Sequence, residues 1–195
     1  MDVDCSHLLA YYSSQNAGRY ATGFASIGVG SCNNTAGFAC QHVGRDGHFE
    51  VGDGSCFGFR SCGMGGFDAG GSLKVGDGSC VGIDGQARIC DAVAVTGNVE
   101  IGDRSCLGHE TCKEFGNEGT GTIGNDSCWG QRACWRTAKY TGEVHIGNGS
   151  CQARHSCRGL AQYAAEGVDN EEGKITIGNN SCNCEGKVLA ERSLF

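Results

Sequence analysis

One short pattern recurs along the whole chain: an aliphatic residue, Gly, two turn-forming residues, Ser and Cys, followed by a segment that ends in a second Cys. Its clearest copy runs from Ile101 to Cys112. Self-similarity at a period in the twenties is typical of stacked-repeat proteins, in which one unit cannot bury its own core. The copies are spaced by 24, 24, 26, 22, 23 and 31 residues and start at Ile27, Val51, Val75, Ile101, Ile123, Ile146 and Ile177.

A short run in which apolar and polar residues alternate precedes most copies, as in Val99-Glu100-Ile101. Such alternation predicts a strand with one buried face. Stacked coils would place these strands side by side in a parallel sheet, about 4.8 Å apart. The predicted fold is therefore all-β, a parallel β-solenoid (β-helix) of about seven disulfide-braced coils with short terminal caps. We expect an N-terminal cap over 1–24, the solenoid over 25–184 and a C-terminal cap over 185–195.

The composition agrees with a hydrogen-bonded repeat. The chain has 35 Gly and no Pro, and Pro cannot donate to a β-ladder. Abundant Gly predicts a positive φ at a corner of every coil. The sequence contains no apolar run long enough to span a membrane. A formal net charge of −7 argues against nucleic acid as a partner, because phosphate binding needs clustered Lys and Arg.

One Ser holds the same corner position in every copy, and we expect its hydroxyl to bond to the rung above or below. These residues are Ser31, Ser55, Ser79, Ser105, Ser127, Ser150 and Ser181. An Asp or Asn stands two residues before the Ser from the second copy onward. We predict that it caps its own turn, with Ca²⁺ binding by stacked carboxylates as the alternative. This column contains Asp53, Asp77, Asp103, Asn125, Asn148 and Asn179. Asn33 and the three Asn of the column also begin N-x-Ser/Thr sequons, for which a glycan is the alternative role.

The chain has 15 Cys, about 8% of its residues, which is near the range of disulfide scaffolds. Such a density is hard to reconcile with a reducing cytosol. The first residues, Met1 to Cys5, have neither a basic start nor an apolar signal region. Either a signal has been removed or the protein is not exported. We expect an extracellular or cell-surface location, with the lumen of an oxidising organelle as the alternative.

The two Cys of a copy persist while their spacing changes between six, eight and ten residues, which suggests a bridge at the base of a small loop. Each such bridge would remove roughly 2–2.5 kcal/mol of unfolded-state entropy. The expected within-repeat pairs are Cys32–Cys40, Cys56–Cys62, Cys80–Cys90, Cys106–Cys112, Cys128–Cys134 and Cys151–Cys157.

Two alternatives to this pairing stay open. A pairing shifted by one Cys, from Cys5–Cys32 to Cys157–Cys182, would give Cys5 a partner and leave only Cys184 over. Reduced thiolates could instead bind a metal, with Cys182-Asn183-Cys184 as a clip, although zinc sites group four ligands. We predict no metal and no cofactor.

The residue after each first Cys forms a further column. We predict that it is core, because it matches the buried aliphatic position of a hexad, with an exposed stripe for sugar rings or a partner as the alternative. The column contains Asn33, Phe57, Val81, Leu107, Trp129, Gln152 and Asn183. For nucleophilic catalysis the sequence offers no G-x-S-x-G elbow. His109, His145 and His155 lie in neighbouring copies but at different positions of the unit. We predict no catalytic residue.

Three resemblances accompany these residues. Leu107–Cys112 and Trp129–Cys134 repeat the six-residue rhythm of the corner in tandem, and this resembles the hexapeptide repeat of left-handed β-helix proteins such as acyltransferases, which lack the cysteine pattern. The six-residue Cys spacing resembles that of beetle-type disulfide-rich antifreeze solenoids. The whole repeat region is similar to Cys-rich I-G-x-x-S-C-x-G-x-x-x-C repeat proteins of diatoms and other marine algae. The resemblance implies a solenoid fold and export.

The predicted function is that of a non-enzymatic, rigid structural, adhesive or assembly module whose partner is a protein assembly or a cell-surface or wall polymer. Glycans are a further candidate partner. A carbohydrate- or ice-binding module is the alternative, and it predicts an exposed aromatic or regular Thr strip. A hexapeptide-type acyltransferase is a remote alternative, and it predicts a cleft with His109 or His155 beside a carboxylate.

Overall fold

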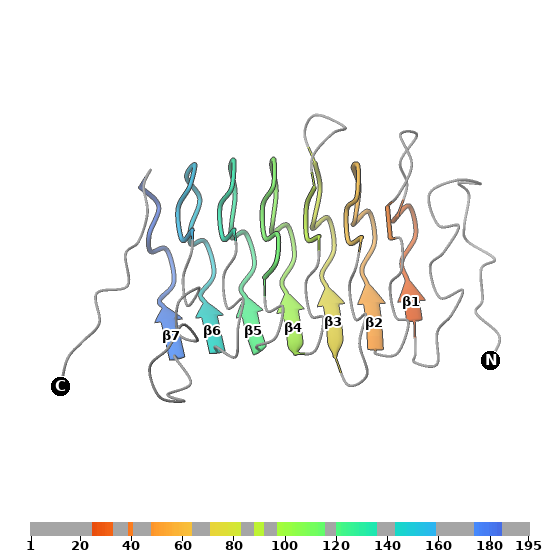
Figure 1. Ribbon diagram of the computed structural model, residues 1–195, viewed down its shortest axis with the longest axis horizontal. Coiled ribbons are helices and arrows are strands. Elements are labelled where there is room, and N and C mark those ends of the chain that lie inside the picture. Colours follow the sequence, from red (N-terminus) through yellow and green to blue (C-terminus); the bar gives the residue numbers. More distant parts are fainter. Residues whose placement is uncertain are drawn as a thin grey trace, which may run out of the picture.

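The computed structural model describes residues 25–32, 39–40, 48–63, 71–82, 88–91, 97–115, 120–135, 143–158 and 174–184. The predicted caps, 1–24 and 185–195, lie outside these residues. Seven short strands form one parallel sheet in sequence order, and a corner follows each strand; in the coils of β2, β4, β5 and β6 the corner leads into a hairpin-like tip (Figure 1). They are β1 Ala25–Ile27, β2 His48–Val51, β3 Ser72–Val75, β4 Asn98–Ile101, β5 Thr120–Ile123, β6 Glu143–Ile146 and β7 Lys174–Ile177.

Each strand pairs with the same position of the next copy, so one repeat supplies one rung of a β-solenoid. Val51 lies beside Val75, and Val75 lies beside Ile101. The polar residues between the apolar ones also stack, and Lys74 Nζ lies 3.5 Å from Glu100 Oε1 on the outward face. The described residues contain no helix, and so none that is long and apolar enough to cross a membrane.

The expected number of disulfide-braced coils is too high. Six bridges are present among the described residues, and no bridge follows β7, where Cys182 and Cys184 are free. A strand, its corner and both half-cystines are described without a gap only within 48–63, 97–115, 120–135 and 143–158. The sequence overstates the count because Ile177–Cys182 repeats the corner without a second Cys at the usual spacing.

The core is a narrow double file of inward side chains together with the half-cystines. Phe49, Leu73, Val99 and Val144 form one file and are at most 2% exposed. The second file is made by the last residue of each strand, from Val51 to Ile177. Burying such side chains is worth about 1.5–3 kcal/mol each. The alternation in the sequence therefore identifies the buried face correctly.

Gly121 interrupts the first file, and the ring of Phe115 fills its place. A Cβ built on Gly121 would lie 2.7 Å from Phe115 Cζ, and Phe115 is fully buried. Phe115 follows Cys112, the second half-cystine of the preceding coil. A residue from the segment between the tip and the next strand therefore replaces the missing strand side chain. The core volume is thus kept at a rung whose strand contributes no inward side chain.

The Gly that follows each strand from β1 to β6 is required by close approach rather than by a positive φ. A Cβ on Gly76 would lie 2.7 Å from the backbone N of Asp103 and would also collide with the Asp103 side chain. The same collision recurs in the neighbouring rungs. Positive φ occurs instead later in the corner, at Gly54, Gly78 and Gly149, where Arg104 and Asp126 also adopt it. The expectation of a positive-φ corner therefore holds, but it explains only part of the Gly content.

The fit between Phe115 and Gly121 predicts a compensating pair of substitutions. Phe115→Ala should lower the free energy of unfolding by about 3–5 kcal/mol because it leaves a cavity. Gly121→Val should also destabilise, because its side chain collides with the ring. The double variant F115A/G121V should be more stable than either single variant, measured by denaturant unfolding of the oxidised protein. Additive losses in the double variant would contradict this packing.

Candidate functional site

The disulfide stack is the most regular feature beside the sheet. The bonded pairs are Cys32–Cys40, Cys56–Cys62, Cys80–Cys90, Cys106–Cys112, Cys128–Cys134 and Cys151–Cys157, with Cα–Cα distances of 5.5–5.8 Å. All twelve half-cystines have no exposed surface. Every bridge closes a loop within one coil, and the pairing shifted by one Cys does not occur among these residues. Cys5 lies outside the described residues.

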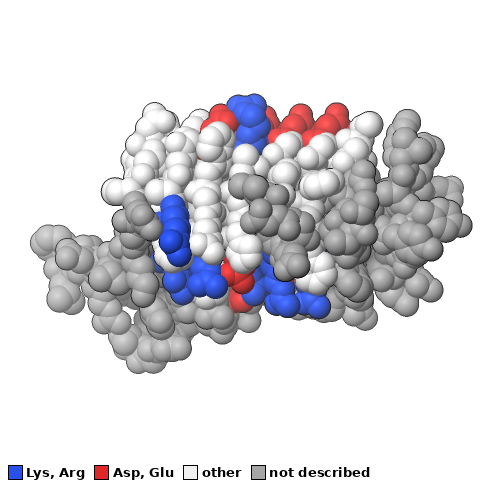
Figure 2. All heavy atoms as spheres, turned by 90° about the horizontal axis from the view of Figure 1, so that it is seen from above, with Lys and Arg blue, Asp and Glu red and all other residues white. Residues whose placement is uncertain are grey.

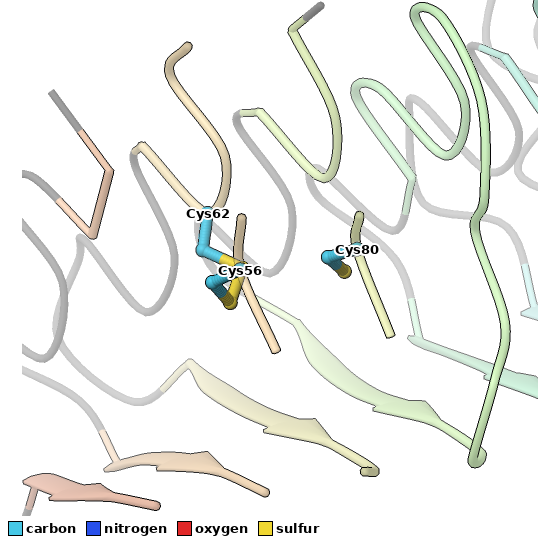
Figure 3. Close-up of side chains that lie close together, drawn as sticks. All are labelled: Cys56, Cys62 and Cys80. Atoms are coloured by element: carbon cyan, nitrogen blue, oxygen red, sulfur yellow. A yellow bond between two sulfur atoms is a disulfide. The ribbon is translucent and has the colours of Figure 1, made fainter. Parts of the chain in front are cut away.

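Neighbouring bridges contact one another, so sulfur forms part of the core. The sulfur atoms of Cys56, Cys62 and Cys80 lie within 4.8 Å of one another. Figure 3 shows the Cys56–Cys62 bridge with Cys80 of the next coil beside it. Three more such groups follow along the solenoid. These atoms belong to disulfides, whereas metal binding requires thiolates. The sulfur groups therefore offer no thiolate donors while the bridges are intact.

All twelve half-cystines have a left-handed backbone, with φ between 48° and 58°. This conformation is uncommon for residues with a side chain. Cys182 has φ of 55°, and its thiol is free and partly buried. Burial raises the pKa of this thiol, and nearby Cys184 raises it further. The corner thus sets the backbone conformation at this position even where no bridge forms.

A serine ladder joins successive corners. Ser105 Oγ donates to Gly124 O at 2.8 Å and accepts from Ser127 N at 3.1 Å, both in the next coil. The same two bonds recur from Ser31 to Ser150. The expectation that these hydroxyls bond to a neighbouring rung is confirmed from Ser31 to Ser150, where each hydroxyl donates to and accepts from the same neighbouring rung. The hydroxyl of Ser181 instead donates to Asn179 O in its own coil.

The Asp and Asn residues form a second ladder, which we call the corner ladder. Asp77 Oδ1 accepts from Asp53 N at 2.8 Å, and Asn125 Oδ1 accepts from Asp103 N at 2.8 Å. The ladder extends from Val29 N, which donates to Asp53, to Asn179. The prediction that each of these residues caps its own turn is wrong, because each caps the turn of the preceding rung. In the described sequons, Asn125, Asn148 and Asn179 are exposed members of this ladder.

The column after the first half-cystine is exposed, so the prediction that it is core is wrong. Phe57 is 43% exposed and Trp129 is 37% exposed, with Val81 and Leu107 half-buried between them. We call these four residues the apolar column. Trp129 Nε1 donates to Arg104 O at 2.6 Å, which fixes the indole beside the corner. Gln152 and Asn183 continue the column as exposed polar residues, and Asn33 lies outside the described residues.

The histidines occupy three different surroundings. His109 Nδ1 has no hydrogen bond among the described residues and lies 3.9 Å from Glu110 Oε2. His145 lies on the outward face of the sheet, with Nδ1 2.7 Å from Thr122 Oγ1 and Nε2 2.6 Å from Glu143 Oε1. His155 lies at the tip, where its backbone N donates to Gln131 O.

The His145 group has the order hydroxyl, imidazole and carboxylate that activates a nucleophile. It borders an open hollow of about 370 Å³ on the outward face, which also includes Lys74, Asn98 and Glu100. Acyl transfer also needs preorganised N–H donors for the oxyanion. The paired strands β5 and β6 use their backbone in the sheet ladder around this group. The sequence analysis did not single out this group. Glu143 lies two residues before His145 on the same strand, whereas the approach of Thr122 to His145 depends on the register of β5 with β6.

Ion pairs at the tips and at the corners perturb the pKa values of acidic side chains. Burial alone would raise the pKa of Glu110, but a 2.6 Å hydrogen bond from Arg132 Nε and nearby positive charges hold it below its usual value. Two hydrogen bonds from Arg104 lower the pKa of Asp126. Asp91 differs, because burial raises its pKa although Lys113, Arg88 and Arg60 act in the opposite direction.

In comparisons with known proteins, no family model matches the chain, and no curated protein or solved structure matches it significantly. Its function is therefore inferred from its own geometry.

The serine ladder gives a direct test. Ser105→Ala removes one donor and one acceptor at a fully buried corner, so we expect a loss of about 1–3 kcal/mol for each group left unpaired. Ser72→Ala is the matched control, because Ser72 bonds to Asn98 on the exposed face and should change stability by less than about 0.5 kcal/mol. Equal effects of the two variants in urea unfolding would contradict the ladder.

Asp91 and Glu110 predict opposite pH dependence. The folded-state pKa of Asp91 is raised, so its carboxylate destabilises the fold at neutral pH, and this penalty disappears as pH falls toward the unfolded value near 3.8. Asp91→Asn should therefore gain stability relative to wild type at neutral pH and lose that gain in acid. Glu110 has a lowered pKa, so Glu110→Gln should lose stability at neutral pH, with the loss fading as pH falls through the folded pKa. Urea midpoints across pH 3–7 would check both signs.

Proposed function

We propose that this chain is a non-enzymatic, rigid structural or adhesive module that works within a larger assembly. The disulfide stack is the observation that carries the proposal. Six bridges, each lying inside one coil, hold the tip of every coil from Cys32 to Cys157. The serine and corner ladders then fix each corner to the next. A body built this way keeps its shape and repeats its surface at one spacing.

The partner we propose is a protein assembly or a cell-surface or wall polymer in an oxidising compartment, outside the cell or in an organelle lumen. The number of disulfides supports such a compartment, because cytosolic thiols are kept reduced. The surface supports a partner that is long and repetitive, since its polar and apolar columns run across several rungs.

A carbohydrate-binding module is the second candidate, and the apolar column favours it. Exposed aromatic residues can stack on sugar rings, and Phe57 and Trp129 are the large aromatic residues exposed in this column. Only two of the four residues of the column are aromatic, which favours the structural proposal over this one.

Ice binding and acyl transfer have weaker support. The outward strand column mixes Ser26, Glu50, Lys74 and Thr122 rather than repeating Thr.

A glycan array separates the two candidates. The oxidised protein should bind no glycan through the apolar column if it is a structural module. Glycan binding that is lost in Trp129→Ala and kept in Gln152→Ala, the next residue of the same column, would contradict the structural proposal and establish the carbohydrate-binding one. Near-ultraviolet circular dichroism of the oxidised variants would verify that each retains its fold.

A further inference from the structure

One long edge of the solenoid is acidic. The corner ladder places Asp53, Asp77 and Asp103 there, and Asp77 Oδ1 and Asp103 Oδ1 each accept from the Asp of the preceding rung. Arg104 and Asp126 follow the same edge and form an exposed ion pair at 2.7 Å. Figure 2 shows this edge as a row of acidic side chains with a basic one among them. We call it the acidic edge.

The opposite edge is basic. The residue two positions before the second half-cystine holds this edge, and in successive coils it is Arg60, Arg88, Glu110, Arg132 and His155. Arg60, Arg88 and Lys113 all act on the buried carboxyl of Asp91, which places them together. Arg132 and Arg158 contact the ring of Trp135 at 5.6 and 4.5 Å. Figure 2 shows basic side chains gathered along this side around acidic ones. We call it the basic edge.

The two edges carry opposite charges in the second, third and fifth copies. Asp53 shares its rung with Arg60, and Asp77 shares its rung with Arg88. In the fourth copy the acidic edge holds both Asp103 and Arg104, so its charge is balanced where Glu110 occupies the basic edge. The fifth copy has Asp126 on the acidic edge and Arg132 on the basic edge.

We propose that the acidic edge of one copy binds the basic edge of a second copy, side by side and in rung register. This inference rests on the proposed structural function and names its partner. The same positions recur along both edges once per rung, about 4.8 Å apart, because both edges belong to the same stacked coils. A sideways shift of one copy then places Asp53 opposite Arg60, Asp77 opposite Arg88 and Asp126 opposite Arg132.

The exposure of these groups suits such contact. Side chains of Asp126 and Arg132 are 39% and 38% exposed, and each also forms an ion pair within its own chain. A single surface ion pair contributes little, so the association depends on several pairs held in register by a rigid scaffold. The contact joins two different edges, and a heterologous contact of this kind extends to further copies instead of closing.

The test uses sedimentation of the full oxidised chain. Wild type should associate progressively with concentration at an ionic strength of about 0.01 M, where the Debye length is about 30 Å, and should be monomeric at about 1 M salt. D53N/D77N neutralises the acidic edge while keeping the amide oxygens of the corner ladder. R60Q/R88Q neutralises the basic edge. Each variant should weaken association at least about tenfold.

The two variants together test the geometry. R60Q/R88Q keeps an intact acidic edge and D53N/D77N keeps an intact basic edge, so an equimolar mixture should form dimers that do not grow further. Control variants lie on the outward strand face: E50Q/E100Q removes two negative charges there, and K74Q removes a positive charge. These controls should associate as wild type does.

Three results would overturn the inference: association unchanged in the edge variants, equal loss in the controls, or no dimer in the mixture. If these results occur and the glycan array is negative, the structural function stands and only the edge pairing is wrong. Glycan binding through Trp129 would overturn the structural function and leave the sedimentation result to decide the edge pairing separately.

Discussion

One inter-strand spacing governs every column of side chains in this protein. The strands pair position by position, so each corner lies directly on the next at about 4.8 Å. At that distance a side chain at position 102 would collide with Asn125 of the next coil, so this position is occupied by Gly102. The same distance lets Ser105 bond twice to a single neighbour. The repeat pattern is the set of residues that this spacing permits.

Sulfur replaces part of the hydrophobic interior that a narrow coil cannot supply. The inward strand side chains form only two files, and the fully buried half-cystines fill much of the remaining cross-section together with Ile89, Phe115 and Ala133. Their left-handed backbone is a conformation that most residues avoid. The bridge offsets the cost of this backbone conformation, because it restricts the unfolded chain and holds both ends of each tip loop. Cys thus serves as a core residue and as a turn residue at the same position.

The sequence predicts the sheet, its buried face and the serine ladder, because each depends on a residue that recurs at one position. It misplaces the column of Phe57 and Trp129, since comparison with a hexad makes these residues core. In the structure Cys106 points inward and the next residue, Leu107, points outward. The two charged edges were also missed. Arg88 belongs to a tip loop of different length, so its alignment with Arg60 and Arg132 becomes clear only once the coils are stacked.

The position of the bridges has a mechanical consequence. No described disulfide joins one coil to the next, so a pull along the solenoid axis is resisted by hydrogen bonds and side-chain packing alone. A coil that detaches cannot extend fully, because its bridge excludes the residues between its two Cys from the stretched chain. The two Cys of a bridge are separated by 6, 8 or 10 positions in the sequence. Each residue withheld shortens the released length by about 3.3–3.6 Å. The protein is therefore built to yield in small, reversible steps, and a change in redox conditions would lengthen those steps.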